Sequence, residues 1–234
     1  KRLSESLRAI EEFGKTLGDR VGASGFASTI EKLRYRGYDV EQRLNLALAT
    51  GVGRQWKVCV LLSESLCKPR GWRDVLKRIV DAGVDCVQVR EKEMDSGWLM
   101  RRVEEVVNVC RPAGVAVIVN DRLDVALLAG ADGVHLGQTD LPPEEVRRLV
   151  GRQLIIGVST ASLDQAKRAI DHGADYCGVG PMFHTTTKHK DVIVGPAYLR
   201  EFVTAYPNVP HLAIGGITVD RMSELVEAGC RGVA

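Results

Sequence analysis

From residue 57 onward, short apolar runs alternate with segments whose apolar residues recur every three or four positions. The runs are KVCVLL (57–62), CVQV (86–89), VAVIVN (115–120), GVHL (133–136), LIIGVS (154–159), YCGVG (176–180), HLAIGG (211–216) and a final GVA (232–234). The segments between them have helical spacing, as in Leu163, Ala166 and Ile170. Almost continuously apolar strands, each followed by a helix, are typical of a parallel sheet covered by helices.

A short repeat indicates how these strands are arranged. We expect the glycine of each copy to end a helix in the left-handed conformation, which glycine adopts without strain. Eight strands built from four two-strand repeats favour a (β/α)8 TIM barrel over residues 56–234, with an open doubly wound sheet as the alternative. The sequence ends at Ala234, inside the predicted eighth strand. The copies, which precede the second, fourth, sixth and eighth strands, are AGVDCV (82–87), AGADGV (129–134), HGADYC (172–177) and AGCRGV (228–233).

Residues 1–50 predict an N-terminal helical hairpin extension that is separate from the barrel. Two apolar stripes flank VGASGFAS (21–28), whose glycines and serines suit a turn, and ATGVGRQ (49–55) predicts a linker. The stripes consist of Leu3, Leu7, Ile10 and Leu17, and of Ile30, Leu33, Val40, Leu44 and Ala47.

Composition excludes several classes of protein. A formal net charge of +2, with basic and acidic residues interleaved, argues against a nucleic-acid surface. No apolar run reaches the roughly 18 residues that span a bilayer, and no secretory signal is visible. The six cysteines form no C-x-x-C pair, which favours reduced packing residues. We therefore expect a soluble, cytoplasmic protein without a nucleic-acid or membrane partner; a homo-oligomer is compatible with this interpretation.

The stretch DCVQVREKEMD places charge directly after a predicted buried strand. Period-two alternation puts Gln88, Arg90 and Lys92 on one face of that strand and Val87 and Val89 on the other. In a TIM barrel the active site lies at the carboxyl ends of the strands, so we expect the three polar side chains at the barrel mouth. Taken alone, these charges could equally begin a solvated loop.

Polar residues or glycines follow the other predicted strands as well, and a polar ligand explains this better than a structural requirement does. They are Asn120 and Asp121 after the third strand, Asp140 after the fourth, Ser159 after the fifth, the loop GPMFHTTTKHK (180–190) with Thr185, Thr187 and Lys188 after the sixth, and Gly215 and Gly216 after the seventh.

The charges in this set favour a polyphosphate bound with a metal ion. Arg90, Lys92 and Lys188 are cations suited to phosphate oxygens. Asp121 and Asp140 would repel such a ligand unless a cation lay between them. Mg²⁺ suits this arrangement, because it is held by one or two carboxylates together with phosphate oxygens and waters.

Several of these residues have a structural alternative. Asp121, Asp140 and Ser159 could each be the N-cap of the following helix. His135, within a strand, is interpreted as a satisfied interior histidine, and no His/Cys spacing suggests zinc. The backbone N–H groups at Gly216 suit a second phosphate.

The motifs QVREK, VND, DGVHLGQTD, GVS, GPMFHTTTK and AIGGI, in this order and spacing, resemble the thiamine phosphate synthase (thiamine-phosphate pyrophosphorylase) family from about Lys57 to Ala234. The resemblance implies a magnesium-dependent transferase of thiamine biosynthesis. Such an enzyme joins 4-amino-2-methyl-5-hydroxymethylpyrimidine diphosphate to 4-methyl-5-(2-hydroxyethyl)thiazole phosphate, giving thiamine phosphate and diphosphate. The implied partners are these two small molecules, and the implied cofactor is Mg²⁺.

The resemblance also implies a role for each matching residue. The family is thought to ionise the pyrimidine to a carbocation before the thiazole nitrogen attacks, so no enzyme nucleophile is needed. The implied metal ligands are Asp121 and Asp140. The implied catalytic residues are Arg90, Lys92, Ser159 and Lys188. The implied substrate-binding residues are Gln88, Arg90, Lys92, Asn120, Ser159, Thr185, Thr187, Lys188 and Gly216.

Other interpretations stay open. LSESLRAIEEFGK and EKLRYRGYDVE resemble part of a helical domain that is sometimes fused ahead of this enzyme and is associated with pyrimidine phosphate kinase activity, which we do not assign. A thiazole tautomerase-like isomerase would not need Asp121, Asp140 and Lys188. A different phosphate-binding barrel, such as a sugar-phosphate isomerase or an indole synthase, would need a carboxylate base that faces the interior. Alternation along the strand predicts that Glu91 faces outward. A regulatory barrel that binds thiamine precursors without releasing diphosphate is the non-enzymatic alternative.

Overall fold

The structure is a computed structural model that describes residues 6, 9–13, 28–34, 36–37, 55–185 and 192–234. Contacts divide the chain into two units, Lys1–Leu48 and Ala49–Ala234. In the described part of the chain, no helix is both long and apolar enough to cross a membrane.

In the first unit, residues 9–13 and 28–34 are helical. Arg34 Nε donates to Glu11 Oε2 over 2.6 Å, and Glu11 is buried. The apolar stripes are only partly visible: Ile10 and Leu33 are each 44% exposed. The other stripe residues apart from Ile30, most of the predicted turn, and residues 49–54 of the predicted linker lie outside the described residues.

The second unit is an α/β fold built on a parallel sheet. Seven strands pair in sequence order, as the alternation of apolar runs and helical segments predicts. The strands are β1 (Cys59–Leu62), β2 (Cys86–Val89), β3 (Ala116–Asn120), β4 (Gly133–Leu136), β5 (Ile155–Thr160), β6 (Tyr176–Val179) and β7 (His211–Ala213).

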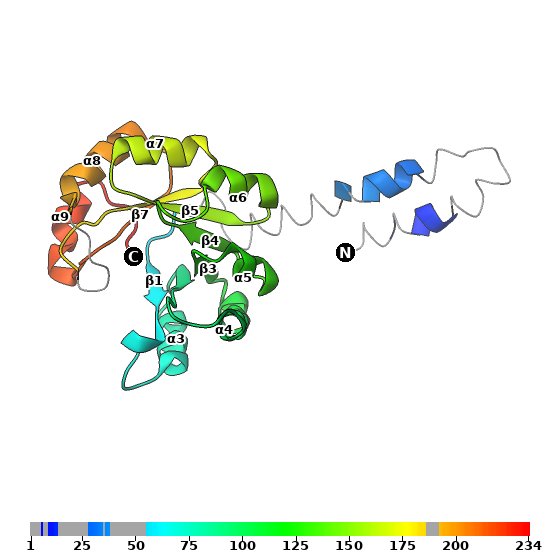
Figure 1. Ribbon diagram of the computed structural model, residues 1–234, viewed down its shortest axis with the longest axis horizontal. Helices are drawn as coiled ribbons and strands as arrows, with labels where there is room; N and C mark the ends of the chain where they lie inside the picture. Colours follow the sequence, from blue (N-terminus) through cyan, green and yellow to red (C-terminus); the bar gives the residue numbers. More distant parts are fainter. Residues whose placement is uncertain (1–5, 7–8, 14–27, 35, 38–54, 186–191) are drawn as a thin grey trace. The chain divides into compact units, whose positions relative to one another are not determined.

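Helices follow the strands and lie around the outside of the sheet (Figure 1). The α-helices are α3 (Trp72–Asp81), α4 (Ser96–Cys110), α5 (Leu123–Leu128), α6 (Pro143–Val150), α7 (Leu163–Asp171), α8 (Gly195–Ala205) and α9 (Met222–Glu227). Short 3-10 helices are η1 (Glu64–Leu66), η2 (Arg111–Ala113) and η3 (Val219–Arg221).

The end of the chain contacts both edges of the seven-stranded sheet. Val233 forms one parallel bridge with Val58, just before β1, and another with Ala213 in β7. Val233 N donates to Lys57 O, and Cys59 N donates to Val233 O, each over 2.9 Å. Val233 therefore lies where the eighth strand is predicted, and its neighbours Gly232 and Ala234 bond Ala213 of β7.

Both faces of the sheet are buried, which explains the nearly unbroken apolar runs. Val87 and Val89 of β2 pack with the helices in the larger core cluster. Cys86 belongs to a second cluster in which every fully buried member except Trp56 is a strand residue. The remaining members of this second cluster are Cys59, Ala116, Ile118, Ile155, Tyr176 and Leu212.

The repeat builds the turns at the amino ends of the strands. Its four glycines are left-handed as predicted, with φ of 80° at Gly83, 67° at Gly130, 89° at Gly173 and 87° at Gly229. The aspartates two residues later in three copies accept backbone N–H bonds that the sequence pattern did not predict. Asp85 accepts from Lys57 and Val58, Asp132 from Val117, and Asp175 from Ile156.

The cysteines are packing residues, as predicted. All six lie in the described part of the chain and are free thiols, and five of them are buried. Burial raises the pKa of both Cys110 and Cys177 to about 12, so these thiols stay protonated at neutral pH.

Several strand boundaries differ from the prediction, among them the carboxyl ends of β5 and β7. β5 extends one residue further, to Thr160. β7 ends at Ala213, before the predicted end at Gly216. The cause is the backbone at Gly215 and Gly216, whose φ values of 104° and 62° cannot continue a strand.

Candidate active site

Hydrogen bonds join neighbouring strands at their carboxyl ends, where the predicted site residues lie. We call the residues that follow the strands at this end the rim. The bonds link these residues almost continuously from β1 to the segment after β7. The bonds run from Arg90 N to Leu62 O (2.9 Å), from Asp121 N to His135 O (2.8 Å), from Gln138 Nε2 to Ser159 O (2.7 Å), from Gly180 N to Thr160 O (3.1 Å) and from Phe183 N to Gly215 O (2.9 Å).

The end of β2 places Gln88 as the alternation predicts. Gln88 is 4% exposed and alternates with the outward-facing Val87 and Val89. Arg90 is half-buried, and its Nη2 is fully buried with no hydrogen-bond partner among the residues that the structure describes. A buried guanidinium nitrogen without an acceptor destabilises the folded protein. We therefore expect a bound ligand to supply an acceptor for Arg90 Nη2. Lys92 is exposed.

Glu91 faces outward, as predicted. Its Oε1 accepts from Arg102 Nη1 of α4 over 2.9 Å and from Glu64 N over 2.8 Å. A carboxylate bound in this way is directed toward the helix layer, which argues against Glu91 as a base on the inner face of the sheet.

Asn120 is the last residue of β3, and Asp121 follows it in the left-handed conformation with φ 63°. A positive φ at a residue other than glycine is uncommon and occurs most often at functional sites and tight turns. Arg122, not Asp121, directly precedes α5, so the N-cap alternative for Asp121 is wrong.

Asp140 turns back toward the end of β4. Its Oδ2 accepts from Gly137 N over 2.7 Å, and a Cβ on Gly137 would lie 2.8 Å from this oxygen. Because Pro142 is the residue that precedes α6, Asp140 is not the N-cap of that helix. Asp121 and Asp140 thus follow two adjacent strands at the same edge of the sheet.

Ser159 of β5 belongs to a buried polar chain. Its Oγ lies 2.8 Å from His135 Nε2, and His135 Nδ1 lies 2.9 Å from the hydroxyl of Tyr176. The interpretation of His135 as a satisfied interior histidine is confirmed. Ser162, whose side chain accepts from Gln165 N, caps α7, so the cap alternative for Ser159 is wrong.

Glycines make room for this chain. A Cβ on Gly157 would overlap the Tyr176 ring, 2.1 Å from its Cζ, and one on Gly178 would lie 3.0 Å from His135 Cε1. The direct contact between His135 and Ser159 was not predicted. Their adjacent strands and shared inward face were the signal that could have indicated it.

The loop after β6 meets the segment after β7. Thr185 is half-buried, whereas Thr187 and Lys188 lie outside the described residues. Gly216 has φ 62°, and a Cβ there would lie 2.2 Å from His184 O, so the two segments approach closely. Arg221 Nη1 donates to Gly216 O over 3.0 Å.

Metal-binding groups are sparse. Among residues 55–185, 192–234 and the short described stretches before them, no three His, Cys, Asp or Glu side chains are grouped as a metal site would need. A hollow of about 580 Å³ is lined by α3, α4 and η2, including Trp72 and Arg73, and by none of the predicted site residues. The rim therefore stays the candidate site, with a carboxylate pair as its possible metal ligands.

The fold and the rim define a parallel α/β protein whose polar side chains gather at the carboxyl ends of its strands. In such proteins, ligands that contain phosphate often bind at this end. Comparison with known proteins narrows the class. The family model described as thiamine monophosphate synthase matches residues 58–234, and the ThiD2 family model matches residues 1–43.

Individual relatives agree with this match. The thiamine-phosphate synthase of Thermosynechococcus vestitus is 37% identical over 233 residues, which cover all of this chain and 64% of that protein. The thiamine-phosphate synthase of Lawsonia intracellularis is 41% identical over 173 residues, which cover 73% of this chain and 79% of that protein. The solved thiamine phosphate pyrophosphorylase from Pyrococcus furiosus superimposes with a TM-score of 0.69 at 32% identity, covering 80% of this chain and 86% of that one.

The chain belongs to the thiamine monophosphate synthase family. It spans just under two thirds of the length of the Thermosynechococcus vestitus relative.

Proposed function

We propose that the protein joins 4-amino-2-methyl-5-hydroxymethylpyrimidine diphosphate to 4-methyl-5-(2-hydroxyethyl)thiazole phosphate, releasing diphosphate and forming thiamine phosphate. Family membership supports the reaction class. The observation that carries the proposal is the buried Arg90 Nη2, which lacks an acceptor within the described ranges. A diphosphate oxygen at the rim would supply this acceptor, and charge-assisted bonds of this kind are strong.

The other rim residues receive roles from their positions. Gln88 faces the same interior as Arg90 and would bind the pyrimidine diphosphate, together with Asn120 and Lys92. Ser159 presents a hydroxyl whose partner His135 fixes its orientation. Thr185 and Gly216 lie on two segments that meet and would bind the thiazole phosphate. Thr187 and Lys188 receive their roles from the family resemblance alone.

Mg²⁺ is the proposed cofactor, and the carboxylate pair suits it. Asp121 and Asp140 follow adjacent strands, and Mg²⁺ in proteins is usually held by one or two carboxylates while phosphate oxygens and waters complete the shell. Asp140 would offer Oδ1, since its Oδ2 is bound by Gly137 N. A bound Mg²⁺ would neutralise charge on the diphosphate.

The proposed reaction requires the protein to stabilise diphosphate as the leaving group. Departure of diphosphate leaves a carbocation on the pyrimidine, and the thiazole nitrogen then attacks it. Arg90 and Lys92 would bind the negative charge that develops on the leaving oxygen, which would lower the barrier if both cations are positioned before the reaction begins. The closely packed rim would limit access of water to the carbocation.

The complete fold is proposed to be an eight-stranded barrel, because Val233 bridges both β7 and the residue before β1. Residues 1–50 are proposed to form a helical hairpin, on the basis of their two apolar stripes and the Glu11–Arg34 ion pair. Six free thiols suit a reducing compartment, so we propose a cytoplasmic location.

An assay of diphosphate release tests the proposed reaction. We expect the full-length protein to release diphosphate only when both substrates and Mg²⁺ are present, in equal amount to thiamine phosphate. EDTA should abolish turnover, and added Mg²⁺ should restore it. Turnover undiminished by EDTA would remove the metal from the proposal, and binding of both substrates without any diphosphate release would favour the regulatory alternative.

A further inference from the structure

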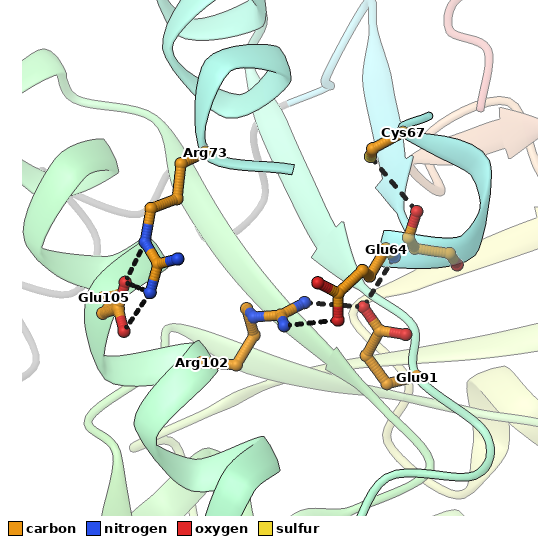
Figure 2. A network of polar contacts seen from close by, with 7 residues as sticks. Glu64, Cys67, Arg73, Glu91, Arg102 and Glu105 are labelled. Carbon is orange, nitrogen blue, oxygen red and sulfur yellow. Dashed lines mark hydrogen bonds and ion pairs between the residues drawn. The ribbon is translucent and has the colours of Figure 1, made fainter. Parts of the chain in front are cut away.

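An ion-pair network lies directly behind the Arg90 segment. Arg102 of α4 has a side chain that is only 10% exposed, and it donates to two carboxylates. Nη1 reaches Glu91 Oε1 over 2.9 Å, and Nη2 reaches Glu64 Oε2 over 2.8 Å. Figure 2 shows the Arg102 guanidinium facing both acids. The guanidinium also stacks over Trp72, with its Cζ 4.0 Å from the ring centroid.

Arg102 and Glu91 are the buried pair of this network, whereas the Glu64 side chain is 52% exposed. The Glu91 side chain is 11% exposed, and its Oε1 accepts from Arg102 and from Glu64 N at the same time. The Arg102 bond lowers the pKa of the Glu64 carboxyl, which stays charged at neutral pH. One guanidinium thus joins α4, the loop after β1 and the end of β2. Removing it would leave Glu91 as a buried charge without its cation.

The same loop holds the backbone of Arg90. Ser63 Oγ donates to Arg90 O over 2.5 Å, and Arg90 N donates to Leu62 O over 2.9 Å. The peptide groups on both sides of Arg90 are therefore fixed to the end of β1. The next side chain along, Glu91, is fixed to Arg102. The only buried side-chain nitrogen or oxygen without a partner in the described part of the chain is Arg90 Nη2, and it belongs to this immobilised residue.

From this geometry we infer that Arg102 is a positioning residue, which holds Glu91 outward and thereby aims Arg90 at the diphosphate of the substrate. Glu91 directly follows Arg90, whose own backbone is bonded to the segment at the end of β1, so fixing Glu91 to Arg102 restricts the orientation of Arg90. The inference rests on the proposed function. Arg102 itself lies on the helix layer and touches neither substrate nor the reacting atoms, so its effect must pass through Arg90.

A neighbouring ion pair gives a matched control. Arg73 of α3 bonds both oxygens of Glu105 on α4 and has its Cζ 4.5 Å from the centroid of the same Trp72 ring. Its side chain is 69% exposed. Figure 2 shows this pair apart from the Glu91 network. Arg73→Met therefore removes an arginine, an ion pair and a stacking contact without touching the Arg90 segment.

Calorimetric titration of inorganic diphosphate with Mg²⁺ into the full-length protein tests the inference. We expect Arg102→Met and Glu91→Gln each to weaken diphosphate binding by about tenfold, since small displacements of a binding group cost this much or more. Arg102→Lys should recover part of the loss, because lysine keeps the charge and loses the fork. Arg73→Met should bind like the wild type. The KM for the thiazole phosphate should be unchanged in all four variants.

A double-mutant cycle separates positioning from general structural damage. If Arg102 acts through Arg90, the variant Arg90→Met with Arg102→Met should bind diphosphate no more weakly than Arg90→Met alone. Losses that multiply would overturn the inference, as would wild-type affinity in a folded Arg102→Met protein. If Arg102→Met does not fold, Glu91→Gln and Arg102→Lys replace it in the binding measurement. Wild-type diphosphate affinity in both of these variants would overturn the inference. Wild-type protein that neither binds diphosphate nor forms thiamine phosphate would instead contradict the proposed function, and the inference with it.

Discussion

At the scale of single residues, Arg90 and Asp121 are the two side chains whose surroundings depart most from ordinary structure. Arg90 has a buried nitrogen without a partner in the described residues. Asp121 is the residue other than glycine for which a positive φ is found in that part of the chain. Both follow strands at the carboxyl end of the sheet. Costs of this kind persist where a function requires them.

Asp121→Asn is expected to lower turnover by well over tenfold while the protein stays folded. The substitution keeps the size of the side chain, and asparagine tolerates the left-handed conformation at φ 63°. What it removes is a negative charge at the proposed Mg²⁺ site. The diphosphate-release assay measures the effect, and circular dichroism checks the fold. Wild-type turnover would show that Asp121 has a purely structural role.

Alternation predicted the placement of Gln88 and Glu91 because the burial of β2 on both faces fixes which side each residue takes. It did not predict the partner of Glu91. Arg102 lies within the apolar stripe of α4, beside the buried Leu99 and Val103. This position in the sequence could have predicted that the arginine is buried. Only the packing of α4 against the loop after β1 determines which acids it meets.

At the scale of elements, helix starts were harder to predict than strands. Asp121, Asp140 and Ser159 all suit an N-cap by residue type, yet the helices begin two or more residues later. The side chains of Asp140 and Ser159 bond the end of a strand or a neighbouring strand instead, and Asp121 is held in the left-handed conformation, which an N-cap does not adopt. The capping preference of a residue type cannot predict such contacts, because they form only when the sheet has folded.

Gly216→Ala is expected to lower the free energy of unfolding by about 1–3 kcal/mol, because φ 62° is strained for alanine and its Cβ would overlap His184 O. Turnover should fall with it, since the loop after β6 would have to move. Gly97→Ala, in the first turn of α4 with nothing within 4 Å of the new Cβ, is the control and should be at least as stable as the wild type. Urea unfolding measures both. Equal stability of the two variants would contradict the close contact seen at Gly216.

At the scale of the whole molecule, the two ends of the sheet differ in character. The carboxyl ends hold the rim, whereas the amino ends hold the repeat glycines and the aspartates that accept backbone bonds. His211 begins β7 at the amino end, where Arg231 N donates to its Nε2 over 3.2 Å. This division agrees with the proposed barrel, because in TIM barrels the amino end contributes to stability and the carboxyl end to function.

His211 should make stability depend on pH. Burial, and then the Arg231 cation, lower its pKa to about 4 in the folded protein. An unfolded histidine has a pKa of about 6.5, so between these values the unfolded chain binds a proton that the folded protein does not. The free energy of unfolding therefore falls as the pH falls from about 6.5 to about 4, by about 3 kcal/mol in total.

Urea unfolding at pH 7, 6 and 5 measures this slope. His211→Gln should lose it, whatever its stability at pH 7, because glutamine does not titrate. His172→Gln, which changes an exposed histidine, should keep it. A slope that survives in His211→Gln would assign the pH dependence to another group.

The most direct test of the account is an experimental structure of the full-length protein with Mg²⁺ and diphosphate. We expect a diphosphate oxygen within hydrogen-bond distance of Arg90 Nη2, and Mg²⁺ bound by Asp121 and Asp140. Diphosphate bound elsewhere, with Arg90 Nη2 still lacking a partner, would contradict the assignment of the rim as the site where the leaving group is held.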